Sequence, residues 1–182
     1  MKYNPDKHHR RSIRLQNYDY TQQGLYFITI CIWQRECLLG NIVGAISYKD
    51  SETLAEIQGN SAYMELNYYG QAVEYNWQIL AKKFRNVVLD KFVIMPNHIH
   101  GIIQLQSSGG KQLSEIIQNF KTSSARRINQ LRNAKGVPVW QRNYYEHIIR
   151  NEESLEIIRE YIVNNPISWN EDKLHPNNPS RW

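Results

Sequence analysis

Two histidines separated by one residue, His98 and His100, are the side chains of this sequence best suited to bind a metal ion. They lie in the apolar run 92–103, which is typical of a buried strand. Side chains alternate faces along a strand, so both imidazoles point one way while Ile99 points the other. Two imidazoles on one face favour an open divalent metal site. The alternative is that two polar residues occupy the solvated face of a half-buried strand.

A second pair of side chains that could take part in catalysis, Tyr161 and Asn165, is spaced four residues apart near the end of the chain. The apolar pattern of segment 156–166 predicts a helix, on which residues four apart share a face. If that face points toward the histidines, a phenol nucleophile and an amide oxygen ligand meet at the same metal. The alternatives are a tyrosine packed on the sheet rim and an asparagine that caps the helix.

The composition indicates a single basic domain. A chain of 182 residues that is 41% hydrophobic is long enough for one compact domain with a full core. Lys and Arg outnumber Asp and Glu by 22 to 17, and the net charge of +5 suits a polyanionic partner. The two cysteines form no disulfide framework, no apolar run approaches the ~20 residues of a membrane span, and no signal peptide is recognisable. These features predict a cytoplasmic protein.

The elements that must position these residues are predicted from the spacing of apolar residues and from the residues that begin or end helices and turns. Residues 1–24 are polar and basic and predict an N-terminal arm, followed by one domain over 25–182. The elements predicted in that domain are a strand at 25–33, a small hairpin or loop at 39–65, a helix at 67–84, strand-like runs at 87–95 and 98–105 that form a hairpin or one bent strand, a helix at 113–131, an extended segment at 139–150, and a helix from Asn151 to just before Pro166. This order predicts a ferredoxin-like α+β sandwich, with an antiparallel sheet, helices on one face and a C-terminal helix that carries Tyr161.

Several further side chains are candidates for nucleic-acid contacts or supporting roles. Basic residues provide sequence-independent phosphate contacts, and aromatic rings stack on unpaired bases. The candidates for these contacts are Arg10, Arg11, Arg14, Arg126, Arg127 and Trp140, with a solvated basic surface as the alternative. Tyr144 and Tyr145 are alternative nucleophiles and His147 a conditional third ligand, but their sequence context favours packing.

Four blocks in order along the chain carry a family resemblance. They read RRSIRL at 10–15 with YDY at 18–20 and GLYFIT at 24–29, VIMPNHIHG at 93–101, VWQRNYYEHIIR at 139–150, and YIVNNP at 161–166. Together they resemble the single-tyrosine HUH transposases, the Y1 or IS200-like family, and within it the REP-associated tyrosine transposases. The resemblance spans most of the chain.

The resemblance implies a role for each site residue. His98 and His100 correspond to the metal ligands, Tyr161 to the nucleophile, and Asn165 to the polar ligand one turn later, with Asn164 as a substitute candidate. The implied cofactor is Mg²⁺ or Mn²⁺, and the implied substrate is single-stranded or hairpin DNA such as REP elements. The REP-associated branch favours a monomer, and the IS200-type relatives offer a homodimer as the alternative.

The implied activity is that of a metal-dependent single-stranded DNA endonuclease and strand transferase that works through a 5′-phosphotyrosine intermediate. No carboxylate stands beside the histidines in the sequence, which favours strand transfer over hydrolysis. Two alternatives have the same site or fold: a hairpin-binding module that does not cut DNA, and a metal-dependent phosphoester hydrolase, which would not need Tyr161.

Overall fold

A four-stranded antiparallel sheet forms the centre of the computed structural model, which describes residues 22–44, 62–106 and 110–178. The strands are β1 (Gly24–Cys31), β4 (Val87–Ile94), β5 (His98–Leu105) and β6 (Tyr145–Ile149), in the spatial order β4-β5-β1-β6. β1 is apolar on both faces and pairs on both sides, as its sequence predicts. The basic arm predicted at 1–24 lies almost wholly outside the described residues.

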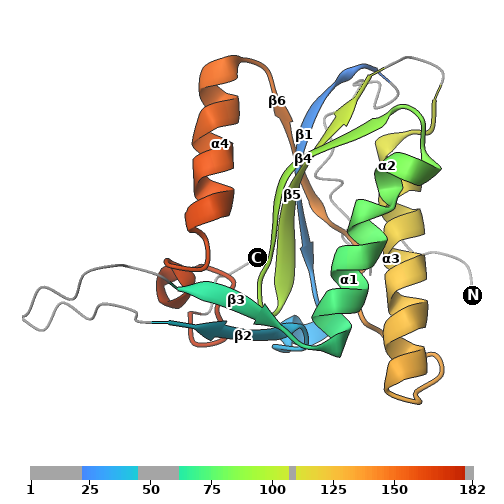
Figure 1. The fold of residues 1–182 in the computed structure, drawn as a ribbon, viewed down its shortest axis with the longest axis vertical. Helices are drawn as coiled ribbons and strands as arrows, with labels where there is room; N and C mark the ends of the chain where they lie inside the picture. The colour runs from blue at the N-terminus through green and yellow to red at the C-terminus, as the bar shows by residue number, and fades with distance from the viewer. Residues whose placement is uncertain (1–21, 45–61, 107–109, 179–182) are drawn as a thin grey trace, which may run out of the picture.

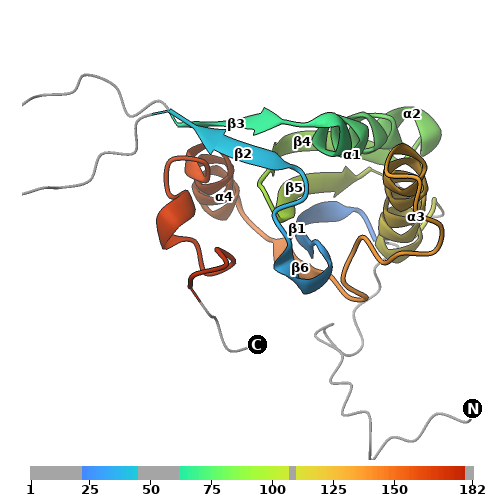
Figure 2. The same ribbon diagram turned by 90° about the horizontal axis from the view of Figure 1, so that it is seen from below.

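The helices cover the two faces of this sheet unequally (Figures 1 and 2). α1 (Tyr68–Gln78), α2 (Leu80–Lys83) and α3 (Leu113–Leu131) lie on one face, and α4 (Glu152–Asn164) lies alone on the other. With this strand order the arrangement is the predicted ferredoxin-like α+β sandwich. No helix within the described ranges has both the length and the apolar character needed to cross a bilayer.

The structure refines several predicted boundaries. The 87–105 segment is a hairpin rather than one bent strand, and β2 (Gly40–Val43) pairs with β3 (Tyr63–Leu66) in a small second sheet. The strand predicted at 25–33 ends at Cys31, because Gln34 and Arg35 adopt left-handed backbone conformations, with φ of 55° and 59°. They form a short 3₁₀ helix, η1 (Trp33–Arg35). The helix predicted at 67–84 is interrupted at Ile79.

Alternation along the strands divides the core into two layers. Tyr26, Ile28 and Ile30 of β1 are fully buried beneath α1 and α3, while Phe27 between them faces α4. On β5, a Cβ at Gly101 would lie 2.4 Å from the ring of Trp77 on α1, so only glycine allows this close approach. The neighbouring His100 therefore points to the α4 face.

α4 is held on its face of the sheet by a small apolar cluster and an ion pair. Leu155 and Ile162 are buried against β1, β5 and β6. Arg159 donates two hydrogen bonds to Asp90 on β4, from Nε at 3.1 Å and from Nη2 at 2.5 Å. Because Arg159 lies two residues before Tyr161, this bidentate pair fixes α4 close to its functional end.

Replacing Asp90 with asparagine is expected to lower the melting temperature of the protein by a few degrees. The substitution removes the charge that holds Arg159, and Arg159 in turn keeps the pKa of Asp90 below its ordinary value through their hydrogen bonds. Differential scanning calorimetry at neutral pH measures the effect. Glu115→Gln is the matched control, because its ion pair with Lys111 is exposed on both sides and is worth little. Equal melting temperatures for Asp90→Asn and the wild type would contradict this account of α4 docking.

Candidate active site

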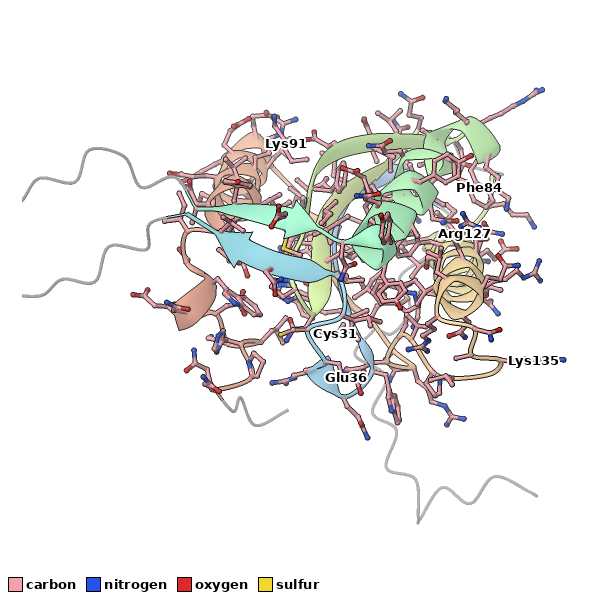
Figure 3. The ribbon with its side chains drawn as sticks, turned by 60° about the horizontal axis from the view of Figure 1, so that its bottom comes forward. Cys31, Glu36, Phe84, Lys91, Arg127 and Lys135 are labelled. Carbon is pink, nitrogen blue, oxygen red and sulfur yellow. The ribbon has the colours of Figure 1, made fainter. Side chains whose placement is uncertain are left out.

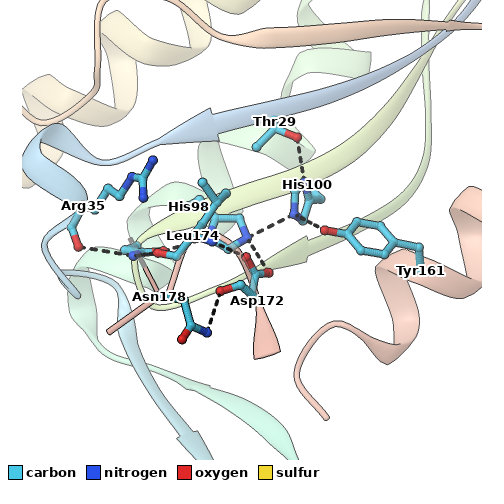
Figure 4. A network of polar contacts seen from close by, with 9 residues as sticks. Thr29, Arg35, His98, His100, Tyr161, Asp172, Leu174 and Asn178 are labelled. Atoms are coloured by element: carbon cyan, nitrogen blue, oxygen red, sulfur yellow. Dashed lines mark hydrogen bonds and ion pairs between the residues drawn. The ribbon is translucent and has the colours of Figure 1, made fainter. Parts of the chain in front are cut away.

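His98 and His100 lie side by side on the face of β5 that points toward α4 (Figure 4). Only 0% and 3% of their surfaces are exposed. Their Nε2 atoms are 3.1 Å apart, and the two rings are nearly perpendicular, at 69°. The predicted placement of both imidazoles on one face is therefore present, but that face is covered by protein rather than solvated.

The hydrogen bonds of Asn97 determine the tautomer of His98. Asn97 Nδ2 donates to the carbonyl oxygens of Leu174 at 2.8 Å and Arg35 at 3.2 Å. Its Oδ1 therefore faces His98 and accepts the Nδ1 proton at 2.8 Å. Nε2 of His98 is left with a free lone pair. Burial holds the pKa of His98 well below 6.5, and the neighbouring His100 lowers it further, so the ring is neutral at physiological pH.

His100 is oriented from both sides. Its Nδ1 lies 2.8 Å from Thr29 Oγ1 on β1, and its Nε2 lies 3.1 Å from the hydroxyl of Tyr161 on α4. When Nδ1 donates to Thr29, the Nε2 lone pair is available to a metal or to the phenol proton. The Phe27 ring stacks on the imidazole at 5.3 Å. Burial lowers the pKa of His100 to about 3, so this ring is also neutral.

A carboxylate completes the cluster, contrary to the expectation that none lies near the histidines. After α4 the chain forms η2 (Trp169–Glu171) and places Asp172 Oδ2 3.8 Å from His98 Nε2. Asp172 Oδ1 accepts from the amide of Leu174 at 2.6 Å, while Oδ2 is buried and has no hydrogen-bond partner among the described residues. The ligand atoms of His98, His100 and Asp172 all lie within 4.8 Å of one another.

α4 brings Tyr161 and Asn165 to this cluster. Tyr161 is 45% exposed, so its hydroxyl reaches His100 while one side of the ring stays open. Burial and then the charge of Asp172 raise the pKa of Tyr161 above 10, and a side-chain hydrogen bond from Asn165 opposes them. Asn164, the substitute candidate, is exposed.

A metal ion fits the chemistry of these residues. Oδ2 of Asp172 and Oδ1 of Asn165 are buried acceptors with no hydrogen-bond partner among the described residues, and each such atom costs free energy if left unpaired. His100 Nε2 is 3.1 Å from that of His98, and a pair of acceptors this close is favourable only with a proton or a cation between them. Two imidazoles and a carboxylate bind divalent transition metals readily.

The other predicted site residues do not converge on this cluster. Arg126 and Arg127 are exposed on α3, on the opposite face of the sheet, where Figure 3 labels Arg127. Trp140 is 7% exposed and donates from its indole nitrogen to Ser124 Oγ at 2.9 Å. Its ring is therefore part of the core, and its contact with bases stays a prediction. Arg10, Arg11 and Arg14 lie outside the described residues.

A cavity of about 660 Å³ opens beside the cluster. Tyr161 and His100 form part of its wall, together with Tyr144 and Tyr145. Tyr144 packs against the main core, and Tyr145 is half exposed with its ring edge toward Phe27. The third residue of that block, His147, is exposed on β6 and is not part of the metal-ligating cluster.

Comparisons with known proteins agree with this arrangement. A protein of Haemophilus influenzae, described as uncharacterized, is 40% identical over 197 aligned residues that cover 96% of this chain and 97% of the relative. The solved structure of a REP-associated tyrosine transposase bound to a REP hairpin has the same fold, with a TM-score of 0.55 and 19% identity over 90% of this chain and 77% of that one. The profile of the family described as "Transposase IS200 like" matches residues 67–165, which hold the histidines, Tyr161 and Asn165. This chain therefore belongs to the IS200-like transposase family.

Proposed function

We propose that this transposase is a metal-dependent endonuclease and strand transferase that acts on single-stranded DNA at hairpin repeats. The observation that carries the proposal is the position of Tyr161 Oη, 3.1 Å from His100 Nε2 and beside three acceptors that share one buried cluster. A nucleophile next to a divalent metal site is what phosphoryl transfer to a protein side chain requires.

The proposed reaction exchanges one phosphoester for another. Tyr161 Oη attacks the scissile phosphorus, the bond from phosphorus to the 3′ oxygen breaks, and a 5′-phosphotyrosine forms. The phenol loses a proton and the departing 3′ oxygen gains one, so no net proton is consumed. Held by the buried cluster, Mg²⁺ or Mn²⁺ would polarise the phosphate and stabilise its developing charge. Because the bond energy is conserved in the protein–DNA link, a second 3′-hydroxyl can reverse the step on another strand without ATP.

His98, His100 and Asp172 are the proposed metal ligands, with Asn165 as an additional amide ligand. The two histidines supply neutral nitrogens and Asp172 the one negative charge. Among the described residues Asn165 Oδ1 is buried without a partner, whereas Asn164 is exposed. His147, on β6 beyond β1, is assigned no ligand role.

Replacing Asp172 with asparagine is expected to weaken Mn²⁺ binding by at least about 10-fold, because the isosteric amide keeps the shape but removes the charge. Isothermal titration calorimetry of the full chain measures the affinity. Glu171→Gln is the matched control, since it makes the same chemical change one residue earlier at an exposed position. If the two variants bind Mn²⁺ equally well, Asp172 is not a ligand.

The DNA partner is proposed from the family, the charge and the fold. The structurally similar REP-associated transposase was solved with a REP hairpin, and the present chain carries a net charge of +5. Phosphate contacts from the arm residues Arg10, Arg11 and Arg14 remain a proposal. Arg126 and Arg127, on the far face of α3, are proposed to meet only DNA that passes around the sheet. A monomer is proposed, because one chain supplies all the site residues.

Formation of a covalent adduct tests the proposed function. The full chain is incubated with a labelled single-stranded hairpin oligonucleotide and Mn²⁺, and the products are separated on a denaturing gel. The expected result is a labelled protein band that EDTA prevents. Tight binding without any adduct would favour the hairpin-binding module, and cleaved DNA without an adduct would favour the hydrolase.

A further inference from the structure

The cavity beside Tyr161 has features that the transfer chemistry alone does not require. Its volume of about 660 Å³ lies within the range of ~300–1,000 Å³ that is typical of small-ligand pockets. Phe27, Tyr144 and Tyr145 give it aromatic walls, and Tyr145 has 45% of its surface exposed. Exposed aromatic rings beside a DNA-cleaving site are suited to stacking on an unpaired base.

The loop 141–143 that forms another wall is held by a lysine from outside the cavity. Lys121 of α3 donates from Nζ to the carbonyl oxygens of Gln141 at 2.5 Å, Arg142 at 2.8 Å and Asn143 at 3.5 Å. The amide of Gln141 also donates to Cys31 of β1 at 2.9 Å. These bonds occupy the backbone carbonyls of the loop and fix its path. The carbonyls of this wall are therefore engaged, and its side chains are the candidates for base recognition.

Two of those side chains are amides with no hydrogen-bond partner in the described part of the chain. Gln141 and Asn143 both line the cavity, and neither side chain makes a hydrogen bond to another described residue. A carboxamide offers two donors and one acceptor oxygen, a pattern that pairs with the edges of nucleobases. The charged side chains of the cavity wall are Arg35 and Lys173, which suit a nucleotide's phosphate, and the acidic Glu171 and Asp172.

We propose that this cavity binds the unpaired base of a nucleotide that flanks the scissile phosphate, with Tyr145 as the stacking surface and Gln141 and Asn143 as the readers of the base edge. The inference rests on the proposed function and deepens it. It assigns a preference for one base beside the cleavage site to the loop 141–143. Lys121 is the positioning residue, because it contacts the loop and not the DNA.

A fluorescence experiment with the full-length Tyr161→Phe variant tests the pocket without cleavage. Hairpin oligonucleotides carry 2-aminopurine at each unpaired position in turn, and its fluorescence is quenched when it stacks on an aromatic ring. The expected result is strong quenching at one position that Tyr145→Ala reduces several-fold. Equal fluorescence at all unpaired positions would overturn the proposal.

Cleavage by the otherwise wild-type enzyme tests the reading of the base. All four bases are placed in turn at the quenched position, and adduct formation is expected to vary by at least about 10-fold, because one good amide–base pair is worth ~1–3 kcal/mol. Gln141→Ala with Asn143→Ala is expected to reduce this ratio to less than about 3-fold, while Gln130→Ala, an exposed amide on α3, leaves it unchanged. If adducts form equally with all four bases, the reading role is wrong and the proposed function stands. If no adduct forms with any base, the proposed strand-transfer function is wrong. The quenching experiment, which needs no cleavage, still tests whether the cavity binds a base.

Discussion

Tyr161→Phe is expected to lower covalent adduct formation by at least about 10³-fold while DNA binding stays within a factor of about three. The substitution removes only the hydroxyl that lies 3.1 Å from His100, and no other described side chain occupies that position. Loss of a nucleophile is among the largest effects a single substitution has on an enzyme. A labelled hairpin oligonucleotide on a denaturing gel measures the adduct, and fluorescence anisotropy measures binding.

Tyr75→Phe is the control for this variant. Tyr75 is an exposed tyrosine on α1, on the other side of the sheet, so its hydroxyl is not expected to affect either measurement. An adduct that persists in Tyr161→Phe would assign the nucleophile to another residue. Loss of both the adduct and DNA binding would show instead that the hydroxyl has a structural role.

His98→Ala and His100→Ala are each expected to weaken Mn²⁺ binding by at least about 100-fold, because each removes one imidazole ligand. A metal at 100 times its dissociation constant stabilises the folded protein by about 2.7 kcal/mol. The wild-type protein should therefore melt at a higher temperature when Mn²⁺ is added, and both variants should lose this increase. Differential scanning fluorimetry with and without Mn²⁺ measures it.

His147→Ala is the matched control, because His147 is on the same face of the sheet but is exposed and outside the cluster. Its melting temperature should still rise when Mn²⁺ is added. The melting temperatures without metal show whether the alanine variants fold. A folded His100→Ala protein that Mn²⁺ stabilises as strongly as the wild type would contradict the proposed metal site.

The sequence predicted the parts of the site that depend on regular periodicity. His98 and His100 share a face because a strand repeats every two residues, and Tyr161 and Asn165 share one because a helix repeats every 3.6. The cap residue Asn151 begins α4 as predicted, accepting from the amide of Ser154. The ferredoxin-like order of elements then brings β5 and α4 together.

Asp172 could not be predicted by the same reasoning. It lies in an irregular segment after α4, where no period shows which side chains point inward, and its position depends on the packing of Trp169 near His98, with ring centroids 6.0 Å apart. The one local signal is the turn in which Asp172 accepts from the amide of Leu174. The burial of Trp140 could not be predicted either, because a tryptophan in an extended segment can face the core or the solvent, and only its bond to Ser124 reveals which.

The most direct test of the central claim is to identify the amino acid that carries the DNA. The adduct formed by the wild-type protein, a hairpin oligonucleotide and Mn²⁺ is digested with nuclease and trypsin, and the modified peptide is sequenced by mass spectrometry. The expected result is a nucleotide attached through its 5′ phosphate to Tyr161, in a peptide that begins after Arg159. Attachment to Tyr144 or Tyr145, or release of a free 5′ phosphate with no modified peptide, would contradict the account.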